Sequence, residues 1–276
     1  MKSLHTLPED ITKLLTEGVE NLNEENLAKF TEDLARLLRL RLKQKSKEPV
    51  KKTLRMSKLG TPDRKLWFEF NVQTTVEVTH PLKFLYGDII ELLVLYLAKE
   101  TGHTIFNEQK THEIDGVIGH QDCGMDEYQI VDVKSASNFS YKKFAERTLF
   151  RNDPFGYVAQ LSSYMKAEGT DKGAFVAVNK ETGEVCVMEV GPSDTIDPEK
   201  RIQDIREMLK SSTPPKDLCY EPVEFGKSGN TQINPSCYYC PFKDLCWAGK
   251  TRKFKYATGI VELVDVKNLP KVEEVY

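Results

Sequence analysis

The sequence has no hydrophobic run long enough to cross a membrane. Its longest apolar stretch, from Ile89 to Ala98, has about half the required length and contains a glutamate. The first ten residues also lack the basic region followed by an apolar stretch that marks a secretory signal. From these two absences we expect a protein that has no membrane partner and works in the cytoplasm.

Positive charge is not in excess, since 39 Lys and Arg stand against 42 Asp and Glu and give a formal net charge of −3. This balance argues against a protein that coats nucleic acid non-specifically. The distribution is uneven, because twelve basic and two acidic residues lie between Arg36 and Lys65. Such a segment predicts a phosphate-binding track, with a solvated charged face as the alternative. The basic residues are Arg36, Arg39, Arg41, Lys43, Lys45, Lys47, Lys51, Lys52, Arg55, Lys58, Arg64 and Lys65.

Hydrophobic periodicity predicts a mixed α/β protein. Apolar residues recur at helical spacing from Asn23 to Leu42, and an apolar helix is expected from Pro81 to Glu100, ending at Gly102. A lysine-rich exposed linker lies between these helices. The remaining elements alternate between β-branched stretches and helices, which indicates a mixed sheet flanked by helices. We expect strands at 103–109, 114–120 and 128–134, adjacent in one sheet, a helix at 155–167, strands at 173–179 and 185–190 joined by the turn 181–183, and a helix at 202–209.

The predicted strand at 128–134 carries the residues that point to chemistry. In a strand alternate side chains share a face, so Asp132 and Lys134 project together while Val131 and Val133 enter the core. Asp122, on the preceding strand or its turn, can be brought beside them. Two carboxylates at one strand are ligands that Mg²⁺ or Mn²⁺ prefers, and a nearby ammonium can position an attacking water. This assembly suits hydrolysis of a phosphodiester.

The order and spacing of these residues resemble the RecB-like PD-(D/E)XK nucleases, in which an acid is followed about ten residues later by an acid-x-lysine. Asp122, Asp132 and Lys134 occupy those positions. The resemblance extends to Gln160 and Tyr164, which share one helical face and match a motif that binds DNA and supports the site. It implies a restriction-endonuclease-like core. Glu91, in the helix before the strands, matches the first motif and is expected to complete the metal shell.

Several neighbouring polar residues are candidates of a different kind. Asp115 lies farther from Asp132 than the pattern prefers and is expected to be structural, and His120 receives no role. Ser135 and Ser137 follow the lysine and could contact phosphate, although hydroxyls often bond to neighbouring backbone. The expected DNA-binding residues are Lys51, Lys52, Arg55, Lys58, Ser135, Gln160 and Tyr164.

Cysteine is concentrated near the carboxyl end of the sequence, where Cys237, Cys240 and Cys246 have a spacing typical of metal ligands. The spacing resembles that of RecB-like nucleases with a [4Fe–4S] cluster, including the CRISPR-associated ones, whose fourth ligand lies far upstream. That resemblance places Asp63 at the fourth position, where the relatives have cysteine. A cluster with an open or lost iron, Cys219 as the fourth ligand, or a zinc site with mixed ligands are the alternatives. Cys123 and Cys186 fall in predicted strands and are expected to be small buried residues.

These expectations combine into one architecture and one leading function. We expect a helical extension with the basic linker at 1–52, a nuclease domain at 53–250 that contains the cysteine cluster at 237–246, and a tail at 251–276. The resemblance implies a Mg²⁺- or Mn²⁺-dependent DNA exonuclease, of the phage or recombination type, that works alone or with a recombination or helicase partner. A structure-specific or non-specific endonuclease and a non-catalytic DNA-binding module are the alternatives.

Overall fold

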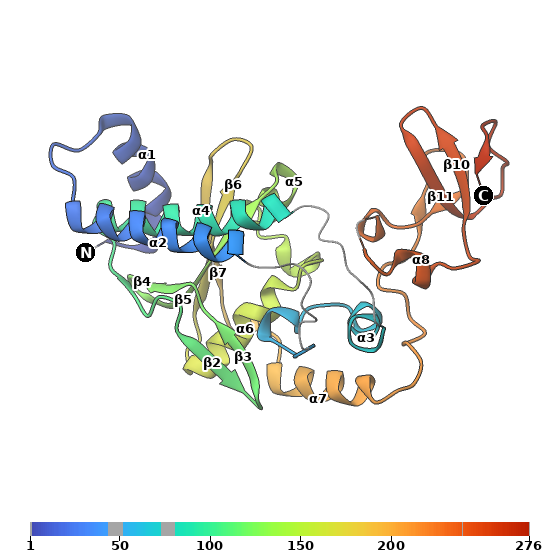
Figure 1. The fold of residues 1–276 in the computed structure, drawn as a ribbon, viewed down its shortest axis with the longest axis horizontal. Coiled ribbons are helices and arrows are strands. Elements are labelled where there is room, and N and C mark those ends of the chain that lie inside the picture. The colour runs from blue at the N-terminus through green and yellow to red at the C-terminus, as the bar shows by residue number, and fades with distance from the viewer. Residues whose placement is uncertain (1, 44–51, 73–80, 239, 276) are drawn as a thin grey trace. The chain divides into compact units, whose positions relative to one another are not determined.

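The computed structural model describes residues 2–43, 52–72, 81–238 and 240–275, and it divides into two compact units (Figure 1). The first unit comprises Met1–Gly60 and Glu77–Asp204, and the second comprises Thr61–Val76 and Ile205–Tyr276. Within the described ranges, no helix is both long enough and apolar enough to span a membrane.

A five-stranded mixed sheet forms the centre of the first unit, with the strand order β1-β4-β5-β6-β7. β5 and β6 run parallel, and the other neighbours are antiparallel. β5 is rich in Val and Ile and lies in the middle of the sheet, so its apolar side chains are buried on both faces. The strands are β1 (Ile105–Phe106), β4 (Cys123–Met125), β5 (Tyr128–Ala136), β6 (Gly173–Asn179) and β7 (Val185–Val190).

Helices cover both faces of this sheet. On one face, α1 (Leu7–Glu17) and α4 (Pro81–Glu100) bury their apolar residues against Val131 and Val133 of β5. On the other face lie α5 (Asn138–Ala145) and α6 (Tyr157–Glu168), where Phe144 of α5 meets Phe175 of β6 edge to face. Asp132 and Lys134, which alternate with the two valines, therefore belong to the face that α6 covers. The 3-10 turns of this unit are η1 (Leu4–Thr6), η2 (Met56–Lys58), η3 (Leu149–Arg151) and η4 (Pro192–Asp194).

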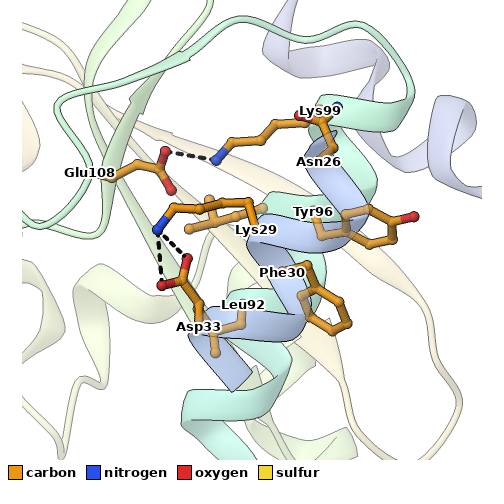
Figure 2. Close-up of a pocket in the computed structure, with 9 residues that line it drawn as sticks. Asn26, Lys29, Phe30, Asp33, Leu92, Tyr96, Lys99 and Glu108 are labelled. Carbon is orange, nitrogen blue, oxygen red and sulfur yellow. Dashed lines mark hydrogen bonds and ion pairs between the residues drawn. The ribbon is translucent and has the colours of Figure 1, made fainter. Parts of the chain in front are cut away.

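Helix α2 (Glu24–Lys43) packs on α4 rather than on the sheet, and none of its residues is fully buried. Phe30 of α2 stacks on Tyr96 of α4 with a centroid distance of 4.8 Å. Figure 2 shows a small pocket between the two helices, edged by the ion pairs Lys29–Asp33 and Lys99–Glu108. Its volume of about 20 Å³ accommodates a single water molecule, so it is not a substrate site.

A separate two-stranded hairpin stands beside the main sheet and corrects the sequence prediction. The stretch 114–120, predicted as one strand of the main sheet, contains instead the turn between β2 (Thr111–Ile114) and β3 (Val117–His120). Asp115 and Gly116 both have positive φ, 48° and 73°, as a two-residue hairpin turn requires. The place in the main sheet that this stretch was expected to fill belongs to β4, which the periodicity does not predict.

The strand predicted at 103–109 is shorter than expected, since β1 spans only Ile105–Phe106, but several other boundaries follow the sequence closely. α4, β6 and β7 have the predicted ends, and α2 begins after Asn23, whose side-chain oxygen accepts from the backbone N–H of Glu25 and Asn26 at 3.1 Å each. α6 begins two residues later than predicted, and α7 (Pro198–Leu209), which crosses the division between the units, begins four residues earlier. The predicted lysine-rich linker lies almost wholly outside the described residues.

The second unit contains α3 (Asp63–Asn71) and a five-stranded antiparallel sheet in the order β12-β10-β11-β9-β8. Two small apolar clusters stabilise it, one around Trp67, Phe68 and Phe242 and the other around Ile233, Cys237 and Trp247. The residues after Lys250 fold into three of its strands, which the sequence analysis does not predict. The remaining elements are β8 (Val223–Glu224), β9 (Thr231–Gln232), η5 (Pro235–Cys237), α8 (Lys243–Cys246), β10 (Arg252–Tyr256), β11 (Gly259–Asp265) and β12 (Glu274–Val275).

Candidate active site

A buried acid and a lysine sit side by side on β5. The Asp132 side chain is 1% exposed and forms an ion pair with the Lys134 ammonium, two residues along the strand. Apart from this ion pair, which involves Oδ2, the carboxylate of Asp132 has no hydrogen-bond partner among the described residues. Burial opposes the charge on Lys134, but the carboxylates of Asp132 and Asp122 outweigh it and hold the lysine pKa above its ordinary value. A buried carboxylate oxygen without a donor is costly, so Oδ1 of Asp132 is open to a further ligand.

Asp122 approaches β5 from the segment between β3 and β4. Its Oδ2 accepts a hydrogen bond from the backbone N–H of Val133 at 2.7 Å, which fixes the carboxylate beside Asp132. Burial, and then the negative charges of Asp132 and Glu91, raise the pKa of Asp122 well above its ordinary value. The structure thus brings Asp122 within electrostatic range of Asp132 and Lys134.

Glu91 comes from α4 and lies within electrostatic range of Asp132 and Lys134. Burial, followed by the charges of Asp132 and Asp88, raises the pKa of Glu91 to about 7. Gln109 donates to its Oε1 at 3.0 Å and holds the carboxylate in place. Three carboxylates from three separate elements thus repel one another across a partly buried site.

The donor set fits a hard divalent cation, which prefers carboxylate oxygens. In the described part of the chain, no three His, Cys, Asp or Glu side chains surround one point closely enough to hold an ion together. Mg²⁺ needs only one or two protein carboxylates, because it keeps several waters. The Asp132 carboxylate, whose Oδ1 has no partner among the described residues, and the adjacent Asp122 meet that smaller requirement.

Gln160 and Tyr164 lie on α6, the helix that covers the sheet face carrying Asp132 and Lys134. Gln160 donates to the Tyr164 hydroxyl at 2.9 Å, and the tyrosine is 2% exposed. Burial raises the Tyr164 pKa to about 12; the Gln160 hydrogen bond opposes the rise, while Asp132 and Asp122 add to it. Gly119 of β3 makes room for this ring, since a Cβ there would stand 2.6 Å from Tyr164 Cε1. The predicted pair is thus joined and lies within electrostatic range of the two acids.

The predicted DNA-binding residues are only partly assembled. η2 packs against α6 and β3, so Arg55 and Lys58 lie near the helix that carries Gln160. Ser135 Oγ is 3.5 Å from the position of a Cβ on Gly87 of α4, at the edge of the site. Lys52 is exposed, and Lys51 lies outside the described residues.

The basic segment between Arg36 and Lys65 is not one continuous element. Its first part is the end of α2, where Arg36 pairs with Asp33 and Arg41 pairs with Asp88 of α4. Its last part, Arg64 and Lys65, belongs to α3 in the second unit. Two of these arginines therefore already have carboxylate partners.

Sequence reasoning missed three residues around the site. Gln109 holds Glu91, and the Tyr157 ring centroid lies 5.0 Å from Lys134 Nζ. Gln121 is fully buried beside Asp122; its Oε1 accepts from His112 Nε2 at 2.6 Å, and its Nε2 donates to two backbone carbonyls. The available signals were weak: Tyr157 precedes Gln160 by three positions on one helical face, and Gln121 adjoins the motif acid.

The cysteine segment does not form the predicted metal site in this geometry, because no group of three suitable donors converges among the described residues. Cys237 packs with Ile233 and Trp247, while Cys246 accepts from Arg64 Nε at 3.1 Å. Burial, followed by the other thiols of the segment, raises the pKa of Cys219 to about 11. Cys219 therefore lies within electrostatic range of Cys237, Cys240 and Cys246, although it is 18 residues before Cys237 in the sequence. Asp63, the expected fourth ligand, occupies the first turn of α3.

The comparisons with known proteins give limited similarity. No protein-family model matches the sequence, and no curated protein matches it. Among the solved structures that resemble the chain is a protein called SSO0001, which is 15% identical with a TM-score of 0.45; the match covers 78% of this chain and 95% of the other. A phage related exonuclease from Haemophilus somnus 129PT is 14% identical with a TM-score of 0.40, and the match covers 57% of this chain and 90% of the other. An alkaline exonuclease from Laribacter hongkongensis is 13% identical with a TM-score of 0.34, and the match covers 55% of this chain and 86% of the other. Similarity at this level establishes neither a fold family nor an activity for this chain.

Proposed function

We propose that the protein is a divalent-metal-dependent deoxyribonuclease whose site is built on Asp122, Asp132 and Lys134, and that it digests DNA from an end. The observation that carries the proposal is the Asp132 carboxylate, buried on β5, whose Oδ2 pairs with Lys134 and whose Oδ1 accepts no hydrogen bond from the described residues. Asp122 and Glu91 add negative charge at the same place. A site of this kind binds a cation or remains strained.

Mg²⁺ or Mn²⁺ would be held by Asp132 and Asp122, with Glu91 completing the shell. When bound, the ion would stabilise charge on the phosphate and lower the pKa of a coordinated water. The Val133 N–H fixes Asp122, and Gln109 fixes Glu91. Lys134, cationic because the acids raise its pKa, would orient the attacking water or neutralise the phosphate rather than remove a proton.

The DNA strand would be held by groups around α6. Gln160 and the Tyr164 hydroxyl would orient the phosphate nearest the acids, and Arg55, Lys58 and Ser135 would bind neighbouring phosphates. Lys51 and Lys52 would extend this contact. Contacts of this type set position and affinity without reading sequence, so we expect digestion that is independent of sequence.

The experiment compares end-labelled linear DNA with closed circular DNA, each in Mg²⁺, Mn²⁺ or EDTA. Wild type is matched with Asp132→Asn, which removes the charge and keeps the shape. The control is Asp115→Asn, the same change in the turn between β2 and β3. We expect wild type and Asp115→Asn to degrade linear DNA when metal is present and to leave circular DNA intact. We expect Asp132→Asn to degrade neither substrate.

Each other outcome selects a different function. Cleavage of the circle would indicate an endonuclease with the same site. Absence of cleavage on every substrate, with DNA binding retained, would replace the enzyme by a DNA-binding module. Loss of activity in both variants would overturn the assignment of Asp132. Unwinding of duplex ends by a helicase or recombination partner stays a prediction.

The iron–sulfur cluster is a separate hypothesis that the nuclease proposal does not need. It is supported by the Cys237, Cys240 and Cys246 spacing and by the nearness of Cys219 to that trio. The thiols do not converge on one ion in the described residues. Iron, acid-labile sulfide and zinc content of protein purified without oxygen would decide between a cluster, a zinc site and free thiols.

A further inference from the structure

An exposed aromatic ring lies on top of a buried aromatic cluster beside the active site. Phe155 is 59% exposed and stacks on Tyr157, with ring centroids 5.4 Å apart and an interplanar angle of 24°. Tyr157 in turn contacts Phe144 and Phe175, which are both fully buried. The outward-facing ring therefore rests on the core of the first unit.

The segment that carries this ring is held firmly. Asp153 accepts from the backbone N–H of Gly156 at 2.9 Å and from that of Val158 at 2.8 Å, which caps the start of α6. Gly156 has a φ of 75° and touches Gly60, since a Cβ on Gly156 would stand 2.5 Å from Gly60 Cα. Little conformational entropy is lost when a ligand binds to a ring fixed in this way.

The stacked pair lies next to the proposed catalytic groups. The Tyr157 ring centroid is 5.0 Å from Lys134 Nζ, and Lys134 pairs with Asp132. Phe155 is thus one ring away from the ammonium that would contact the substrate. The exposed Phe155 ring and the nearby Lys134 ammonium suit a nucleotide, because its base can stack on the ring while its phosphate pairs with the lysine.

We propose that Phe155, supported by Tyr157, is a platform on which an unpaired base next to the scissile phosphate stacks. The proposal rests on the nuclease function above and deepens it, because it names the substrate as a single strand or a frayed duplex end. A base inside a closed duplex is already stacked on both faces and cannot use the ring. Stacking is tolerant of base identity, in keeping with sequence-independent digestion.

Binding is measured without cleavage, so that this inference is tested apart from the enzyme. A single-stranded oligonucleotide carries 2-aminopurine near its end, and titration in EDTA follows both affinity and quenching of the base. The variants are Phe155→Ala, Phe155→Leu and Phe155→Trp. The matched control is Phe139→Ala, because Phe139 on α5 is 71% exposed and contacts Lys143 instead of Tyr157.

We expect Phe155→Ala and Phe155→Leu to weaken binding by about 5- to 150-fold and to abolish the quenching. Phe155→Trp should keep both, and Phe139→Ala should change neither. The decisive comparison replaces the terminal nucleotides with abasic sites, on which wild type and Phe155→Ala should bind equally. An equal loss on normal and abasic strands, or an unchanged affinity, would overturn the platform.

The two proposals fail in distinguishable ways. Stacking without cleavage in any metal would keep the platform and remove the nuclease. Cleavage with unchanged quenching in Phe155→Ala would keep the nuclease and remove the platform. Retention of DNA binding with loss of a protein–protein contact in Phe155→Ala would assign the ring to a protein partner and also remove the platform.

Discussion

The acidic site and the cysteine segment differ in how their side chains are held, although sequence spacing points to a metal in both. Glu91, Asp122 and Asp132 come from α4, the segment before β4, and β5, all of which pack into the large core of the first unit. The thiols of Cys237 and Cys246 come from η5 and α8, elements of three and four residues. Those elements pack only in two small apolar clusters.

This difference teaches that converging ligands need a scaffold that is stable without the metal. The core of the first unit keeps three carboxylates close although burial, and then their mutual repulsion, raises the pKa of Glu91 and Asp122. Short elements cannot hold ligands together against such a cost, so without an ion their thiols pack in the apolar clusters and accept from neighbours such as Arg64. The predictions below separate these two situations.

The largest effect is expected for Lys134→Met, which removes the ammonium and keeps most of the side-chain volume. Loss of the group that contacts the water or phosphate should lower kcat by about 10²- to 10⁴-fold. The same change leaves Asp132 buried without its ion-pair partner and should destabilise the metal-free protein by about 3–5 kcal/mol. Single-turnover rates and urea unfolding in EDTA measure the two effects.

A double variant tests whether this instability arises from the buried charge. Lys134→Met combined with Asp132→Asn should recover most of the stability and none of the activity, because the amide is neutral. If the double variant is no more stable than Lys134→Met alone, the cost lies in packing around Tyr157 instead of in the carboxylate.

The second prediction concerns the pH dependence of stability without metal. The Glu91 pKa rises from 4.5 in the unfolded chain to about 7 in the folded protein, so the folded state binds more protons between these values. The free energy of unfolding should therefore fall as pH rises from about 4.5 to 7, by about 2–3 kcal/mol from Glu91. Asp122 acts in the same direction.

Thermal unfolding followed by circular dichroism from pH 5 to pH 8 in EDTA checks this slope against Glu91→Gln. The stability of Glu91→Gln should fall less between pH 5 and pH 8 than that of wild type. Mg²⁺ should stabilise wild type most at pH 8, where the carboxylates are ionised. If the stability of the two proteins falls with pH to the same extent, Glu91 does not interact with the other carboxylates of the site.

Sequence reasoning succeeded where a local pattern decides the structure. Asp132 and Lys134 share a face because strands alternate, and Gln160 and Tyr164 meet because helices bring positions four apart together. It failed where distant contacts decide, as in the separate β2–β3 hairpin and the short β4. Gln109 and Tyr157 were missed for the same reason, since their roles depend on α4 and β5 lying beside them. β10 has three basic residues among its five, so its hydrophobic pattern is weak.

A smaller effect is expected for Gly119→Ala. The added Cβ would stand 2.6 Å from Tyr164 Cε1 and 2.8 Å from Met56 Cβ, so one of these groups must move. Overpacking of this kind costs about 1–3 kcal/mol. Displacement of Tyr164 should lower kcat more than it raises KM. An unchanged kcat with the expected loss of stability would make Tyr164 a packing residue only.

The smallest effect, and the most direct test of the comparison, concerns Cys237, which is 8% exposed beside Ile233 and Trp247. If the thiol only packs and accepts from the Trp247 indole, Cys237→Ala should cost about 1 kcal/mol, and Cys237→Ser should cost less because its hydroxyl can still accept from Trp247. If the thiol ligates a metal, both substitutions should be equally and strongly destabilising and should release iron or zinc. Both tryptophans, Trp67 and Trp247, belong to the second unit, so tryptophan fluorescence follows the unfolding of that unit alone. Unequal costs of the two substitutions without metal release would establish that, unlike the acidic site, this segment is organised by packing.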